Sequence, residues 1–241
     1  MASKEVMHSK RLRLVSASLT IAMCGTAGLG AARQPTTTPA PANVNDWLIV
    51  PGKRAGPITP RTTRADLVRF FGAKNVEDGE IVGSDGGRQS GTIVFGDQPD
   101  ASLGVLWLDD TPDAHIRSIV FCHGSELAEK CRWHTEEGVS FGTDLKNLER
   151  LNGRKFKLNG FDWGYGGLIT SWEGGRLEHF GIACGRVTLR LDPTPAPPSE
   201  ERSSFIEQVE DSDEFWSSDG PMQGLNPAVD HLTMSFQGCN R

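Results

Sequence analysis

The sequence predicts an α+β protein made of two tandem modules, each a short helix packed on an antiparallel sheet, with a C-terminal strand docking back. Three observations support this prediction. A helix-like segment recurs along the chain, strand-like segments follow each copy, and an alternating apolar segment at 229–236 precedes the last cysteine. A terminal strand that carries a cysteine is expected to be tied down rather than frayed.

The recurring segment predicts two short helices. Thr62 and Thr143, which lie 81 residues apart, stand where a helix N-cap is expected, and apolar residues follow at helical spacing. Gly72 and Gly153 then supply a C-terminal residue that tolerates a left-handed backbone. The predicted helices cover residues 63–71 and 143–152.

Antiparallel strands are predicted after each helix, because β-branched and aromatic residues occur there in alternating order. Trp107 and Trp172 both close such a segment, at an offset of 65 residues. The first module therefore holds about 16 extra residues, which we assign to a Gly-rich insertion at 77–89. The predicted strands are 91–95, 102–108, 116–121, 155–158, 167–172, 177–182 and 187–191.

The first 32 residues have the layout of a secretory signal peptide. Basic residues precede an uncharged stretch at 14–32, and Arg33 is the first charge after it. We expect cleavage near Ala32 and a protein that is periplasmic or secreted. Two alternatives stay open: lipid attachment at Cys24, which the bulky Met23 disfavours, and an uncleaved membrane anchor.

Changes in composition divide the rest of the chain into five parts. Residues 33–46 form a Pro- and Thr-rich linker, and the two modules occupy 47–135 and 136–193. A Pro-rich acidic segment follows at 194–222, and the C-terminal strand belongs to 223–241.

Cysteine usage fits an oxidising compartment. Outside the leader the chain has an even number of cysteines, so disulfides are expected. Three pairings are possible. We favour the pairing that closes one short loop and ties the tail to the body, which joins Cys122 to Cys131 and Cys184 to Cys239.

Two metal sites are weaker alternatives, and no cofactor is expected. A zinc site would combine thiolates with imidazoles, but adjacent ligands rarely reach one tetrahedral ion. Its ligands would be Cys122, His123, Cys131 and His134. A calcium site would use loop carboxylates whose spacing fits no EF-hand. These are Asp97, Asp100, Asp109, Asp110 and Asp113.

The candidate binding residues lie in a stretch of aromatic residues and glycines. They are Phe161, Asp162, Trp163, Tyr165, Trp172 and Glu173. Aromatics exposed between glycines would make a contact surface, with the two carboxylates as polar partners. The competing interpretation is hairpin structure, with glycines at turns and aromatic pairs across strands. A third interpretation is that Asp162 and Glu173 are the paired carboxylates of a glycoside hydrolase.

Segments 58–76 and 138–172 resemble a group of exported bacterial proteins of unassigned function. These share a Thr-capped helix, a terminating glycine, and a Phe-x-Trp-x-Tyr-Gly-Gly stretch followed by Ser-Trp. The duplicated helix-plus-sheet pattern is also similar to periplasmic small-lipoprotein and β-lactamase-inhibitor modules. This resemblance implies binding rather than catalysis, and it supplies no catalytic residues.

Several functions are disfavoured by composition and motifs. A net charge of -6 without a basic stripe argues against a nucleic-acid partner. No nucleophile elbow, P-loop or dinucleotide fingerprint occurs.

We therefore expect a non-catalytic binding protein of the bacterial cell envelope. Its partner would be an unknown envelope protein or ligand, and it would touch a membrane only through a possible N-terminal anchor. The alternative is a secreted or periplasmic hydrolase of wall sugars or peptides that uses Asp162, Glu173 or His179.

Overall fold

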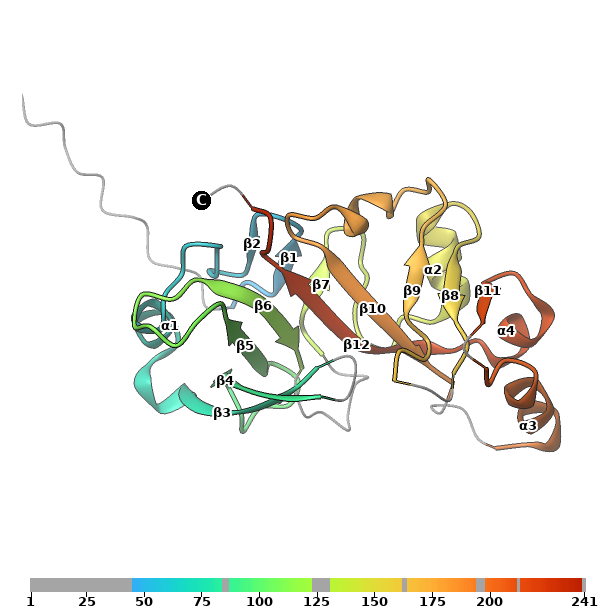
Figure 1. Cartoon of the computed structure of the whole chain (residues 1–241), viewed down its shortest axis with the longest axis horizontal. Coiled ribbons are helices and arrows are strands. Elements are labelled where there is room, and N and C mark those ends of the chain that lie inside the picture. The colour runs from blue at the N-terminus through green and yellow to red at the C-terminus, as the bar shows by residue number, and fades with distance from the viewer. Residues whose placement is uncertain are drawn as a thin grey trace, which may run out of the picture. The chain divides into compact units, whose positions relative to one another are not determined.

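The computed structural model describes residues 45–83, 87–122, 131–161, 164–193, 198–211 and 213–239 (Figure 1). The predicted signal peptide lies outside these residues, as does almost all of the predicted linker. The described part mixes helices with several β-sheets, which confirms the α+β class. The helices are α1 (Arg64–Phe71), α2 (Leu145–Asn152), α3 (Glu200–Glu207) and α4 (Gly220–Leu225), with short 3-10 helices η1 (Ala73–Asn75) and η3 (Glu178–Gly181).

A six-stranded antiparallel sheet is the largest element. Its strand order is β10-β12-β6-β5-β4-β3, so the C-terminal strand lies between β10 and β6 (Figure 1). The predicted docking of that strand is thus seen in the sheet. The strands are β3 (Val76–Val82), β4 (Arg88–Val94), β5 (Leu103–Trp107), β6 (Ile116–Phe121), β10 (Val187–Asp192) and β12 (Ala228–Ser235).

Two three-stranded sheets flank this arrangement. One has the order β2-β1-β7 and includes a parallel pairing of β1 with β7; the other has the order β11-β8-β9 and is antiparallel. The first sheet consists of β1 (Leu48–Val50), β2 (Arg54–Ala55) and β7 (His134–Thr135). The second consists of β8 (Lys157–Asn159), β9 (Ile169–Ser171) and β11 (Glu214–Trp216).

The two predicted helices form; α1 begins one residue later than expected and α2 begins two residues later. The N-caps are Thr63 for α1 and Asp144 for α2, because these side chains accept from the backbone N–H three residues on. The preceding threonines act in the turn before each helix instead. Thr62 Oγ1 accepts a hydrogen bond from the Thr59 N–H at 2.9 Å, and Thr143 Oγ1 accepts one from the Ser140 N–H at 3.0 Å.

Two predicted elements differ from the structure. The expected strand at 177–182 is mostly the 3-10 helix η3, because the buried Leu177 and Phe180 are three residues apart and the Phe180 N–H bonds the Leu177 carbonyl at 2.9 Å. The expected insertion at 77–89 forms β3 and the start of β4. Strand β3 lies at the edge of the sheet and is acidic. It was not predicted because its sequence lacks the alternation of apolar and polar residues that indicates a strand.

The main core covers one face of the six-stranded sheet. Leu103, Val105 and Trp107 of β5 all point into it, as their alternation predicts. Trp133 is fully buried there, and its indole N–H donates to the Ala101 carbonyl at 2.9 Å. Leu67 of α1 and other helix residues complete the packing.

A small second cluster lies on the opposite face of this sheet. Ile81, Leu106 and Val120 are buried together there, and Ile93 packs against them. Ile81 reaches its place by lying directly over Gly104. A Cβ atom at that position would be 2.7 Å from Ile81 Cγ2.

Both favoured disulfides are present. Cys122 bonds Cys131 across nine positions of sequence, and Cys184 bonds Cys239 across 55. The second bond ties the chain beyond η3 to the segment that follows β12. Within the residues described, no helix has the length and apolar character needed to cross a bilayer.

Candidate functional site

The aromatic–glycine stretch does not form one exposed surface. Phe161 and Trp172 are only 8% and 6% exposed, and both belong to the main core. Trp172 packs on Phe156 and Phe180, with ring centroids 5.2 and 5.9 Å apart. Because both side chains are buried, they do not contribute to an exposed contact surface. Two further residues of the stretch, Asp162 and Trp163, lie outside the described residues.

Glu173 belongs to a polar network on that sheet. It accepts from the Ser171 hydroxyl at 2.8 Å and lies 3.9 Å from Lys157 Nζ. Lys157 pairs with Glu214 at 2.9 Å, and the Thr170 hydroxyl donates to Glu214 at 2.6 Å. The Thr170 hydroxyl and the Lys157 ammonium hold the pKa of Glu214 below its ordinary value, and the bond to Glu214 raises the pKa of Lys157.

His179 belongs to a different local arrangement from Glu173. Its Nε2 lies 3.0 Å from Glu137 Oε1, and its Nδ1 lies 2.9 Å from the Arg176 carbonyl oxygen. Glu173 and His179 therefore contact different residues. A hydrolase that used both side chains would need them to converge on one concave site.

Metal binding at the predicted positions meets a chemical obstacle. Cys122 and Cys131 share a disulfide, so neither offers a thiolate to zinc. Among the residues that the structure covers, no three His, Cys, Asp or Glu side chains gather closely enough to hold an ion. Of the other two zinc candidates, His134 lies in β7 with its Nδ1 2.8 Å from the Arg132 carbonyl oxygen, and His123 lies outside the described residues.

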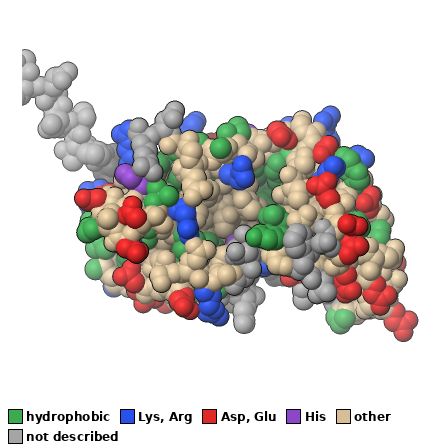
Figure 2. All heavy atoms as spheres, viewed as in Figure 1, with side chains coloured by type: hydrophobic (Ala, Val, Ile, Leu, Met, Phe, Trp, Pro, Cys, Tyr) green, Lys and Arg blue, Asp and Glu red, His purple; other side chains and the backbone are tan. Residues whose placement is uncertain are grey.

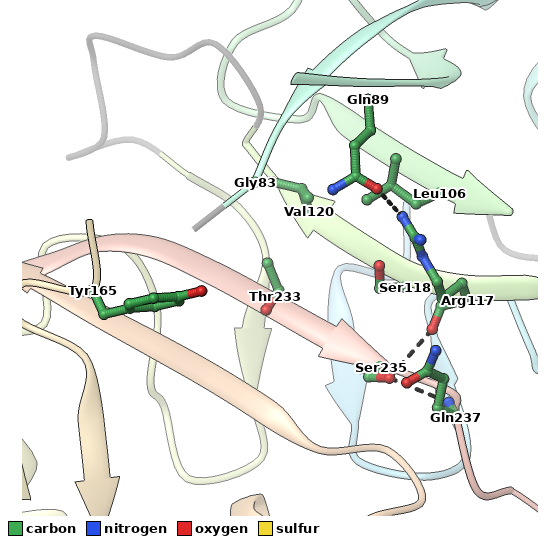
Figure 3. A pocket seen from close by; sticks show the side chains of 10 residues that line it. All are labelled: Gly83, Gln89, Leu106, Arg117, Ser118, Val120, Tyr165, Thr233, Ser235 and Gln237. Carbon is green, nitrogen blue, oxygen red and sulfur yellow. Dashed lines mark hydrogen bonds between the residues drawn. The ribbon is translucent and has the colours of Figure 1, made fainter. Parts of the chain in front are cut away.

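Tyr165 is the member of the predicted set that faces a pocket. It is 49% exposed, and it approaches the six-stranded sheet from the segment between β8 and β9. Figure 3 shows its ring extending toward Thr233 on β12. The pocket has a volume of about 270 Å³ and lies on the sheet face that carries the small second cluster. Its lining consists of Gly83, Gln89, Leu106, Arg117, Ser118, Val120, Tyr165, Thr233, Ser235 and Gln237.

The floor of the pocket comes from the pairing of β6 with β12. Val120 pairs with Thr233, and Ser118 pairs with Ser235, so alternate residues of both strands face the same side. Leu106 of β5 and Val120 supply the apolar part of the floor. The rest of the floor is polar, with hydroxyl groups from Thr233 and Ser235 of β12 and from Ser118 of β6.

Arg117 enters the pocket because of an irregularity in the sheet. The register of β5 and β6 shifts so that Leu106 pairs with Ser118 while Trp107 pairs with Ile116, which leaves Arg117 between the two pairs. Its guanidinium donates to the Gln89 side-chain carbonyl (Figure 3). Its backbone carbonyl accepts from the Ser235 hydroxyl at 3.3 Å.

The charge around the pocket contrasts with the rest of the surface. None of the ten described residues that line the pocket is acidic, whereas the chain has a net charge of -6. Figure 2 shows acidic side chains gathered where α3 and β11 reach the surface. The predicted acidic segment therefore lies apart from the pocket lining.

Most of the pocket lining was missed by sequence analysis. The residues come from several segments, and only Tyr165 was singled out beforehand. The local signal was the strand-like composition of β6 and β12, which identified both as strands without showing that they pair with each other. Pairing between distant strands is decided by tertiary packing.

The fold and the site together define a disulfide-bonded α+β protein with an open polar pocket on one sheet face. Comparison with family models, curated proteins and solved structures gives no match. The chemistry of the pocket is therefore the basis for assigning a function.

Proposed function

We propose that this chain is an exported, non-catalytic binding protein of the bacterial cell envelope, and that it binds a small ligand in the pocket on the six-stranded sheet. The observation that carries the proposal is the make-up of that pocket. An aromatic ring, an arginine, and several hydroxyl and amide groups converge on a floor held rigid by paired strands. Sites of this kind bind and orient ligands.

Binding is favoured over catalysis because the described residues of the lining lack the groups that most often transfer protons in enzymes. They include no carboxylate, histidine, lysine or cysteine, and Tyr165 is the one side chain among them of a type that can act as a general acid or base. The two serines of the lining, Ser118 and Ser235, lie on β6 and β12. A serine nucleophile needs an adjacent base to activate it.

Export is supported by the signal-peptide pattern and the two disulfides. Mass spectrometry of the protein recovered from the producing bacterium tests this part of the proposal. We expect a mature chain that starts near Arg33 and carries two intact disulfides. A full-length chain with free thiols in the cytoplasm would contradict it.

The binding role is tested by native mass spectrometry after incubation with an extract of envelope small molecules. We expect a retained adduct on the wild type and on Ile182→Ala, a matched control because Ile182 is exposed and lines neither described pocket. We expect Tyr165→Ala to lose the adduct while keeping its circular dichroism spectrum. An adduct that Tyr165→Ala retains in full would contradict the proposed site.

A further inference from the structure

Arg117 is the one charged side chain among the described residues that line the pocket. Among the described residues no carboxylate forms an ion pair with it, and the partner of its guanidinium is the neutral amide of Gln89. Arg190, on the same sheet, differs in this respect, because Asp230 pairs with it at 2.7 Å. A guanidinium without a carboxylate partner, at the edge of a pocket, suits an anionic ligand.

Two hydroxyl groups beside Arg117 are available for further bonds. The side chains of Ser118 and Thr233 line the pocket, and neither hydroxyl has a hydrogen-bond partner within the described part of the chain. Each can donate one bond and accept others. The side-chain amides of Gln89 and Gln237 add further hydrogen-bond donors and acceptors. The surroundings of the arginine therefore match a ligand that carries hydroxyl groups.

Tyr165 and the pocket volume limit the size and shape of the ligand. About 270 Å³ lies just below the roughly 300 Å³ at which drug-sized pockets begin, so one ring with its substituents fits. Tyr165 is half exposed, and its ring extends over the side of the pocket near Thr233 (Figure 3). Such a ring offers an apolar face, while its hydroxyl keeps a polar edge.

We propose that the ligand is an acidic sugar: a single hydroxylated ring with one carboxylate. The carboxylate pairs with Arg117, the ring hydroxyls bond Ser118 and Thr233, and the apolar face of the ring lies against Tyr165. This inference rests on the proposed binding function and adds the chemical class of the ligand.

Isothermal titration of the mature protein with three probes tests the inference. D-glucuronate and D-glucose share one ring and differ at the carboxylate, and D-glucose 6-phosphate replaces the carboxylate with a phosphate. We expect glucuronate to bind about tenfold or more tightly than glucose, because bonds to a charged partner are the stronger ones. The preference should weaken as salt rises.

Variants separate the roles of the two side chains. Arg117→Gln should remove the preference for glucuronate over glucose, and Tyr165→Ala should weaken glucuronate binding. Arg61→Gln is the matched control, since this exposed arginine lines neither described pocket and should leave both affinities unchanged. Circular dichroism establishes that each variant is folded.

The outcomes distinguish this inference from the proposed function. Equal affinity for glucuronate and glucose, tighter binding of the phosphate, or no binding of any probe would overturn the acidic-sugar assignment. If the envelope adduct still depends on Tyr165 in those cases, the binding function stands with another ligand. If the adduct is also indifferent to Tyr165, both proposals fail.

Discussion

Gly104 leaves room for the Ile81 side chain on one face of the six-stranded sheet, and Gly104→Ala should be costly. The added Cβ would lie 2.7 Å from Ile81 Cγ2 and 3.0 Å from Ile81 Cγ1, well inside normal contact. Ile81 is fully buried, and its branched side chain also lies close over Gly91, so it has little room to move. Overpacking of this kind destabilises a protein by about 1–3 kcal/mol.

Urea unfolding followed by tryptophan fluorescence, with both disulfides intact, measures this change in the free energy of unfolding. The matched control is Gly181→Ala in η3, where an added Cβ meets no atom within 4 Å. That variant should equal the wild type or gain up to about 1 kcal/mol, because it restricts the unfolded chain. Since Ile81 packs on Leu106 and Val120 of the pocket floor, Gly104→Ala should also weaken ligand binding. A Gly104→Ala protein as stable as the control would refute the close packing of Ile81.

Three further predictions concern polar groups and crosslinks. Asn152→Ala should cost about 2–6 kcal/mol in unfolding, because Asn152 is buried and the change leaves the Trp172 carbonyl and the Leu177 N–H without their bonds at 3.0 and 3.1 Å. Thr170→Val should raise the pKa of Glu214 toward its ordinary value, as measured by an NMR titration of the carboxyl, because the Thr170 bond is the largest influence lowering it. Replacing Cys184 and Cys239 by alanine should lower the free energy of unfolding by about 4 kcal/mol, according to the chain-entropy argument. Removing the Cys122–Cys131 disulfide, which joins residues nine positions apart, should lower it by about 2.5 kcal/mol.

Each of these predictions has a control or a contrary outcome. The control for Asn152→Ala is Asn147→Ala on the exposed side of α2, which should change the free energy of unfolding by less than about 0.5 kcal/mol. If Asn152→Ala changed it by no more than this control, the proposed structural role of Asn152 would be contradicted. A Glu214 pKa unchanged by Thr170→Val would rule out the bond between them. A larger loss from the shorter disulfide would contradict the chain-entropy argument.

The sign of the Glu214 effect on stability follows from the direction of its pKa shift. The pKa in the folded protein lies below the unfolded value, so the stabilisation is present above the unfolded pKa and is lost as the pH falls through the folded pKa. Because the side chain is largely exposed, solvent screening keeps this contribution small.

Local signals predicted the helices and most strands well. Capping side chains and C-terminal glycines act within a few residues, so the ends of α1 and α2 could be placed to within one or two positions. Strand β6 was predicted with its observed bounds, because it is rich in β-branched and aromatic residues. Four cysteines allow three pairings, and the favoured one, which closes a short loop and ties the tail to the body, is the pairing observed.

The candidate site was less predictable because the sequence shows apolar character but not which side of a small sheet meets solvent. Trp172 and Tyr165 have similar glycine-rich surroundings, yet one is in the core and the other at a pocket. Arg117 reaches the pocket through a register shift that no composition pattern reveals. The floor depends on a pairing of β6 with β12, and these strands are more than 100 residues apart in the chain.

The central position of β12 also controls when the protein can fold. Synthesis begins at the N-terminus, and β12 is made after every other strand of the six-stranded sheet. Until β12 is made, β10 and β6 lack the strand that joins them, and the β6–β12 pairing spans a long stretch of sequence. The complete six-stranded sheet therefore forms late, after all its other strands are already present.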